Sequence, residues 1–113
     1  MNSITLGTSR IRELNDAFRK GGPLSGRWIL TQGVLAQGPA FLAIALNAVQ
    51  SFDNFTPDND PHREHDFGAI TVGQERLFWK IDYYDRTLRF GSERPDDETM
   101  TVRVLTLMLA SEY

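Results

Sequence analysis

The sequence predicts an α+β fold in which helices pack against an antiparallel β-meander. Two observations support this prediction. Apolar side chains recur at helical spacing in the first half of the chain, and two strand-like segments flank a Gly73-Gln74 turn in the second half. The 113 residues fit one domain, 1–113, with elements in the order α-β-α-β-β-β-α.

The first element is expected to be a helix over residues 9–20, ended by Gly21 and Gly22. Helical spacing divides its residues into two groups. The apolar face holds Ile11, Leu14, Ala17 and Phe18, and the residues away from it are Arg12, Asn15, Asp16 and Arg19. We therefore expect the first group to pack against the rest of the protein.

Residues 26–35 and 39–51 are predicted to form a strand and a second helix. The strand is aromatic and β-branched but does not alternate cleanly, so both of its faces are expected to be covered. The helix opens with Pro39, a residue favoured at the first helical position. Only Asn47 and Gln50 are strongly polar in it, and we therefore expect it to be the most buried helix.

The clearest β pattern is a hairpin of residues 65–72 and 75–84. Because side chains alternate between faces, counting back from the turn predicts which residues lie opposite each other. The predicted pairs are Ile70 with Leu77, Gly68 with Trp79, Asp66 with Ile81, Ala69 with Phe78, Phe67 with Lys80, and His65 with Asp82.

Two further elements are expected after the hairpin. A short strand over 87–91 would place Arg89 opposite Asp82. The last element is predicted to be a helix over 97–111, because acidic residues suit its positive N-terminal end. Its inner stripe would consist of Val102, Leu105 and Leu109, widened by Val104, Leu107 and Met108.

Composition excludes several classes of function. The chain has no cysteine, which excludes disulfides, thiol nucleophiles and cysteine-ligated metal centres. Its net charge is −3 and it has no dense basic stripe, so nucleic acid is not an expected partner. The longest apolar stretch, 39–49, is too short to cross a bilayer, and the N-terminus lacks a signal-peptide pattern. We expect a cytoplasmic protein without a bound cofactor.

The segment 53–66 concentrates the polar side chains that could form a site, and it holds both histidines. Its clustered Asp and Asn residues and two prolines predict a loop. Tyr84 of the hairpin is a further candidate for a contact surface. The candidate binding residues in the loop are Asp58, Asn59, Asp60, His62, Glu64 and His65.

Two interpretations of this loop involve a metal. Asp58-Asn59-Asp60 begins like a calcium loop, but the EF-hand positions for glycine and glutamate hold Arg63 and Ala69. The two histidines lie three residues apart, whereas a helical zinc-protease motif requires four. The ligands of a transition-metal or metal-dependent catalytic site would be Asp58, Asp60, His62 and His65, with Asp82 as a further candidate.

The third interpretation is structural. Asp and Asn side chains hydrogen-bond to nearby backbone amides in loops, and a long loop without core contacts must supply its own hydrogen bonds. In this interpretation His65 pairs with Asp82 across the hairpin, and Arg89 completes a small charge network. Elsewhere the sequence contains no nucleophile elbow and no phosphate-binding loop.

Several motifs resemble the signature of a small bacterial family of unknown function. The central ones are FDNFTPDNDPHREHDFG at 52–68, LFWKIDYYD at 77–85 and LRFGS at 88–92. Residues 11–19 and 103–110 also resemble the family. The similarity therefore covers nearly the whole chain.

The resemblance implies a compact accessory protein, since such proteins occur on bacterial chromosomes and plasmids beside other accessory genes. It supplies no catalytic residue. Family members usually have glycine after the loop histidine, where this chain has Arg63, so the turn at this position is expected to differ. The mobile-element setting suggests a counter-defence role, such as inhibition of a restriction or CRISPR nuclease.

Two hypotheses about function follow. The first is a non-enzymatic module that binds another protein through the 53–66 loop and the acidic residues of 51–113, which contain 13 acidic and seven basic side chains. The absence of a nucleophile constellation, a cofactor loop and a basic stripe favours it. The alternative is a metal-binding protein or metal-dependent enzyme that uses the same loop.

Overall fold

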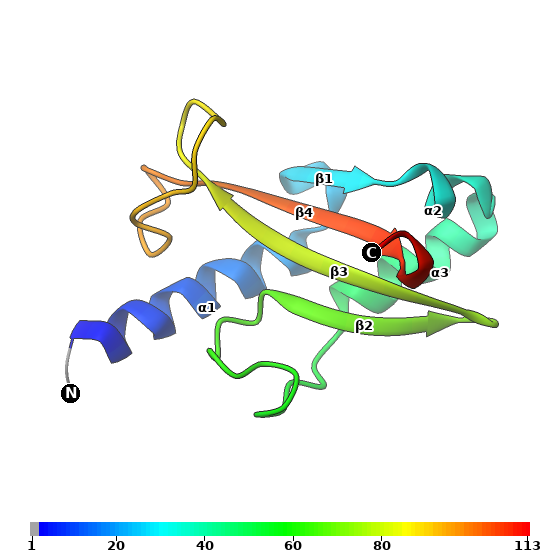
Figure 1. Ribbon diagram of the computed structural model, residues 1–113, viewed down its shortest axis with the longest axis horizontal. Coiled ribbons are helices and arrows are strands. Elements are labelled where there is room, and N and C mark those ends of the chain that lie inside the picture. The colour runs from blue at the N-terminus through cyan, green and yellow to red at the C-terminus, as the bar shows by residue number, and fades with distance from the viewer. Residues whose placement is uncertain (1–2) are drawn as a thin grey trace.

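The computed structural model describes residues 3–113 as a four-stranded sheet with three α-helices (Figure 1). The helices are α1 (Ser3–Gly21), α2 (Gln32–Ala36) and α3 (Pro39–Gln50). The strands are β1 (Arg27–Leu30), β2 (Phe67–Val72), β3 (Glu75–Tyr84) and β4 (Val102–Leu109). Two short 3-10 turns, η1 (Pro23–Ser25) and η2 (Ala110–Glu112), precede β1 and follow β4.

The sheet is mixed, with strand order β1-β4-β3-β2. β2, β3 and β4 form an antiparallel meander, and β1 pairs with β4 in parallel. The predicted α+β class and the meander are confirmed. The hairpin register is also as predicted, from Phe67 opposite Lys80 to Ile70 opposite Leu77. Gly73 in its turn has a φ of 60°, a conformation that glycine adopts without steric cost.

The third strand of the meander is β4, so the predicted helix over 97–111 is wrong. β4 lies between β1 and β3, and most of its side chains are buried on both faces. A strand in this position has a nearly continuous apolar sequence, which periodicity alone cannot distinguish from a buried helix. The β-branched residues Thr101, Val102 and Val104 favour the extended conformation.

Two other segments depart from the expected strands. β1 stops early because Thr31 caps α2, with Val34 N donating to Thr31 Oγ1 at 3.4 Å. The predicted strand over 26–35 is therefore correct only in its first part. Residues 87–91 form turns with one isolated bridge to the end of β3, because Asp85 Oδ1 accepts hydrogen bonds from the backbone that follows it.

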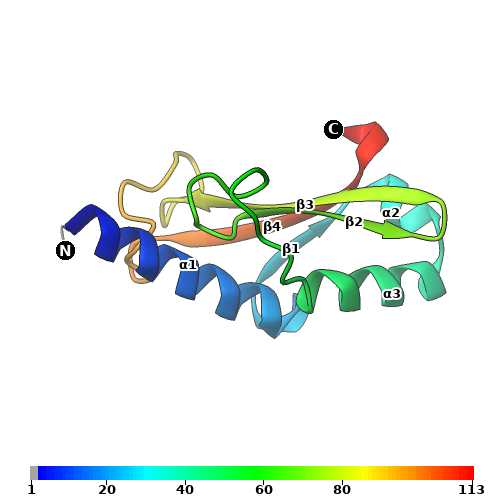
Figure 2. The same cartoon turned by 90° about the horizontal axis from the view of Figure 1, so that it is seen from below.

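Helices α1 and α3 lie on one side of the sheet, and the C-terminus lies on the other (Figure 2). α3 is less buried than predicted: Ala45 and Val49 are buried, but Ile44 is 59% exposed. No helix in residues 3–113 is long and apolar enough to span a membrane.

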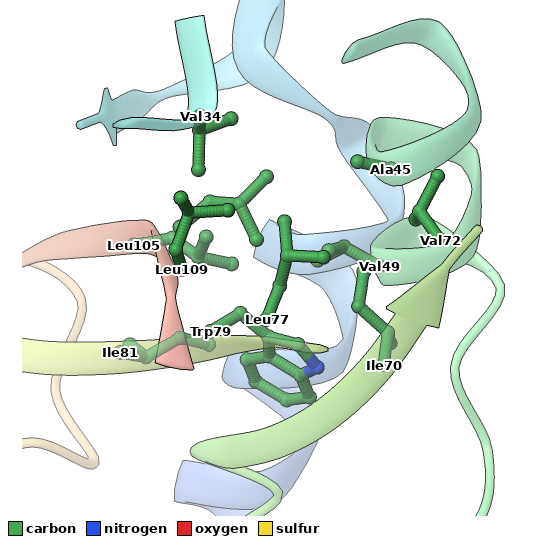
Figure 3. Packing of buried hydrophobic residues seen from close by; sticks show 11 residues of the cluster. Val34, Ala45, Val49, Ile70, Val72, Leu77, Trp79, Ile81, Leu105 and Leu109 are labelled. Carbon is green, nitrogen blue, oxygen red and sulfur yellow. The ribbon is translucent and has the colours of Figure 1, made fainter. Parts of the chain in front are cut away.

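The core fills the space between these helices and the sheet (Figure 3). Trp79 is its largest buried side chain. Gly68 makes room for it, because a Cβ at that position would come within 2.4 Å of the indole Nε1. The buried residues of the core are Val34, Ala45, Val49, Ile70, Val72, Leu77, Trp79, Ile81, Leu105, Leu107 and Leu109.

Candidate functional site

The loop 53–66 leads from α3 to β2, and its own polar groups hold its conformation. Thr56 N donates to Asn59 Oδ1 at 2.8 Å, and Asn59 Nδ2 donates to Asn54 O at 2.9 Å. Asp60 is buried, and its Oδ1 accepts a hydrogen bond from His65 N at 3.2 Å. Two of the predicted binding residues, Asn59 and Asp60, therefore stabilise the loop backbone.

His65 connects this loop to α1. Its φ is 55°, which interrupts the strand alternation just before β2. Its Nδ1 lies 2.9 Å from Asp16 Oδ1, and its Nε2 lies 3.6 Å from Asp60 Oδ2. Phe55 stacks on the imidazole with a centroid separation of 3.7 Å. Both ring nitrogens and one ring face are therefore engaged by the protein.

The predicted network of His65, Asp82 and Arg89 is not formed. The hydrogen-bonding partners of His65 are on α1 and in its own loop. Asp82 instead places Oδ2 3.1 Å from Lys80 Nζ. Arg89 lies in the turns after β3, where its backbone N donates to Asp85 Oδ1 at 3.3 Å. The positive φ of His65 explains the difference, because a register count assumes an extended backbone.

The proposed metal ligands are only partly brought together. His65 is in contact with Asp60, whereas Asp58 and His62 are exposed. Among the residues that the structure describes, no group of three or more His, Asp or Glu side chains is arranged to hold a metal ion.

A buried polar network, to which the sequence did not point, joins the loop to α1 and β4. Asn15 is fully buried; its Nδ2 donates to Tyr83 Oη at 2.8 Å and to Glu64 O at 2.9 Å. Its Oδ1 accepts a hydrogen bond from Arg103 Nε at 2.7 Å. Tyr83 Oη donates in turn to Glu64 Oε1 at 2.7 Å. Hydrogen bonds therefore run without interruption from β4 through α1 to the loop.

Burial changes the pKa of groups in and beside this network. Burial and the hydrogen bond to Glu64 raise the pKa of the Tyr83 hydroxyl, which therefore stays protonated as a donor. Burial lowers the pKa of the Arg103 guanidinium, which remains charged at neutral pH. Burial, followed by the nearby Glu64 carboxylate, raises the pKa of Asp66. The direction of each shift follows from the partial burial of these groups where the loop meets the sheet.

Arg19 is a second residue to which the sequence did not point, and it is only 1% exposed. Its Nη1 donates to the carbonyl oxygens of Val49, Gln50 and Phe52, at 2.9, 3.2 and 2.9 Å. Its Nη2 lies 3.1 Å from Asp16 Oδ1. Since the last carbonyls of a helix have no partner within the helix, Arg19 caps the C-terminus of α3.

The predicted faces of α1 are partly reversed in the structure. Asn15 and Arg19 were expected away from the packed face but are buried, and Ala17 was expected on it but is exposed. Asn15 and Arg19 lie four residues apart and therefore share one side of the helix. The sequence shows that spacing. It does not show the partners of the two residues, because these lie far away along the chain.

Arg63 is the residue at which the family resemblance led us to expect a different turn, and its φ is 58°. This left-handed conformation is strained for any residue with a Cβ. We expect Arg63→Gly to raise the free energy of unfolding by about 0.5–1 kcal/mol in urea denaturation, because the relieved strain exceeds the added chain entropy. Arg89→Gly is the control without a positive φ and should be neutral or destabilising. A loss of stability at position 63 would contradict this account.

The sheet face opposite α1 and α3 is a second candidate surface, which we call the open face. Two clefts border it. One, of about 510 Å³, is lined by Ile29, Tyr84 and Leu88 among others. The other, of about 310 Å³, lies between Asn59 and Phe78. The residues of the open face are Arg27, Ile29, Phe67, Ala69, Thr71, Arg76, Phe78, Lys80, Asp82, Tyr84, Val102, Val104, Thr106 and Met108.

Apolar side chains are exposed on and around this face. Ile29 is 52% exposed, and Leu88 and Phe90 of the adjoining turns are exposed as well. At the other end, Tyr113 packs edge-on against Phe78 with ring centroids 5.4 Å apart. Apolar and aromatic side chains therefore occur at both ends of the open face, whereas Val104 and Met108 of this face are buried.

Comparison with known proteins confirms the family resemblance. A family model described as "Protein of unknown function (DUF3768)" matches residues 30–112. This range includes the loop, β2, β3 and β4, and it begins after α1. No curated protein and no solved structure matches the chain.

Proposed function

We propose that this chain, which belongs to the DUF3768 family of proteins of unknown function, is a non-enzymatic module that binds another protein through its open face. One observation supports the proposal above all. Helices α1 and α3 cover one face of the sheet (Figure 2), whereas the opposite face presents exposed apolar side chains. Ile29 and Leu88 line the same cleft, and exposed apolar side chains grouped in this way are typical of protein–protein interaction sites.

The composition of the open face also favours a protein partner. Aromatic residues, arginine and methionine are enriched in interfaces, and this face contains Phe67, Phe78 and Tyr84 together with Arg27 and Arg76. The two clefts give a partner's side chains places to insert, as interface hot spots require.

The loop 53–66 contributes the rim of this surface in our proposal. Asn59 lines the cleft beside Phe78, and Asp58 and His62 are exposed. The contacts of His65 with Asp16 and Asp60 support a structural role for its imidazole, because a general base needs a ring nitrogen within reach of substrate.

Charge substitution on the open face tests this function. The double variant Ile29→Asp, Leu88→Asp should reduce the amount of partner captured from a lysate of the native cell by about tenfold or more, since buried unpaired charge strongly weakens an interface. Quantitative mass spectrometry of the retained proteins measures this loss.

The matched control is Ile44→Asp, Leu35→Asp, which changes two exposed aliphatic residues of α3 and α2 and should retain the partner. Circular dichroism checks that both variants are folded. Equal capture by the open-face variant and the wild type would contradict the proposal. Identification of the captured protein also tests the counter-defence role, which requires a nuclease of a host defence system.

A further inference from the structure

A cleft of about 560 Å³ lies between α1, the start of β1 and the start of β4. Its apolar lining residues include Leu14, Phe18 and Val102. Three arginines also line it, Arg27, Arg86 and Arg103, against a single carboxylate, Glu98. In a protein of net charge −3, this is a local concentration of positive charge.

Arg103 is 8% exposed, yet no carboxylate forms an ion pair with it. Its hydrogen-bond acceptors are neutral: Nε donates to Asn15 Oδ1 at 2.7 Å, and Nη2 donates to Pro95 O. Its guanidinium also lies over the Tyr83 ring, 5.3 Å from the centroid. Buried charges in proteins are usually paired, whereas the Glu98 and Glu64 carboxylates interact with Arg103 without an ion-pair contact.

The other two arginines of the cleft leave their guanidinium groups available. Within residues 3–113, neither Arg27 nor Arg86 forms a side-chain hydrogen bond or an ion pair, and both are exposed. Glu98 forms no ion pair with them; its ion-pair partner is Arg10, with Nη2 4.0 Å from Oε1. Three guanidinium groups thus border one space that is lined by a single carboxylate.

We propose that this cleft binds a small organic anion, with its carboxylate or phosphate group against Arg27, Arg86 and Arg103 and its apolar part against Leu14 and Phe18. The planar guanidinium group donates two parallel hydrogen bonds to either anion. Gly26 brings the backbone close to the apolar wall, because a Cβ there would lie 2.3 Å from Phe18 Cε1. The cleft shares Arg27 with the open face, but anion binding in it does not require a protein partner.

Titration with phenyl phosphate and with benzoate, followed by ¹⁵N–¹H NMR, tests the site. We expect saturable shifts of the Arg103 Nε–Hε resonance and of the backbone amides around residues 86 and 101–103 with at least one probe. The probe that binds more tightly identifies the anion, phosphate or carboxylate. The double variant Arg27→Gln, Arg86→Gln should raise the Kd by about tenfold or more, because charged hydrogen bonds are lost.

The control variant Arg63→Gln, Arg76→Gln makes the same change of charge at two arginines that do not line the cleft and should leave the Kd unchanged. Its amide spectrum and that of the cleft variant also report whether each remains folded. Absence of saturable shifts with both probes would overturn the proposal. So would a Kd that both double variants change equally, since this would indicate only general electrostatic attraction.

Discussion

Arg19→Met is expected to lower the free energy of unfolding by about 3–5 kcal/mol. Methionine keeps most of the aliphatic part of the side chain. The loss of stability therefore reports the contribution of the guanidinium group alone. Three carbonyls at and just after the C-terminus of α3 lose the Arg19 donor, and Asp16 loses its ion pair with Arg19. The guanidinium also leaves its place over the rings of Phe55 and Trp79. Urea denaturation followed by tryptophan fluorescence measures the change.

Arg10→Met is the matched control, because it makes the same substitution on the same helix. The Arg10 side chain is exposed, and its pair with Glu13 spans 3.4 Å. An exposed ion pair contributes little, so this variant should differ from the wild type by less than about 0.5 kcal/mol. Similar effects at positions 10 and 19 would show that Arg19 does not cap α3.

Asn15→Leu should destabilise the protein by about 2–4 kcal/mol, although the two side chains have similar size. Leucine cannot donate to Tyr83 Oη and Glu64 O or accept from Arg103 Nε. The buried Arg103 then loses one of its few acceptors, and an unsatisfied buried donor costs more than a lost exposed hydrogen bond. Thermal or urea unfolding measures this effect.

Two comparisons make the result at Asn15 specific. Asn47→Leu is the same change at an exposed position of α3 and should be close to neutral. In a double-mutant cycle, Asn15→Leu and Tyr83→Phe should be non-additive by at least about 0.5 kcal/mol, since the two side chains share a hydrogen bond of 2.8 Å. Strict additivity would argue against a connected network.

The parts of the fold that the sequence predicted correctly depend on local information. The hairpin register follows from the Gly73-Gln74 turn and the alternation on either side of it. The strand β4 could not be predicted from local sequence. Its position between β1 and β3 buries both of its faces, so its sequence lacks the alternation of polar and apolar residues. The place of an element in the sheet is a tertiary property, and it decided the secondary structure of 102–109.

The same distinction applies to the candidate sites. The loop 53–66 was identifiable from its composition, and so were the turn-forming roles of its Asp and Asn residues. The partner of His65 could not be identified from the sequence, because the positive φ of His65 turns its side chain toward α1. Arg103 and Asn15 are 88 residues apart in sequence, and no local pattern links such a pair. The open face became visible only when the strand order was known.

Site-specific photo-crosslinking in the native cell tests the central claim, binding through the open face, most directly. A photoreactive phenylalanine derivative is placed at position 29 on the open face in one variant and at position 44 on α3 in another, both at exposed side chains. Our account predicts a discrete crosslinked protein from position 29 and none, or much less of it, from position 44. Crosslinking of a discrete partner from position 44 alone would contradict it.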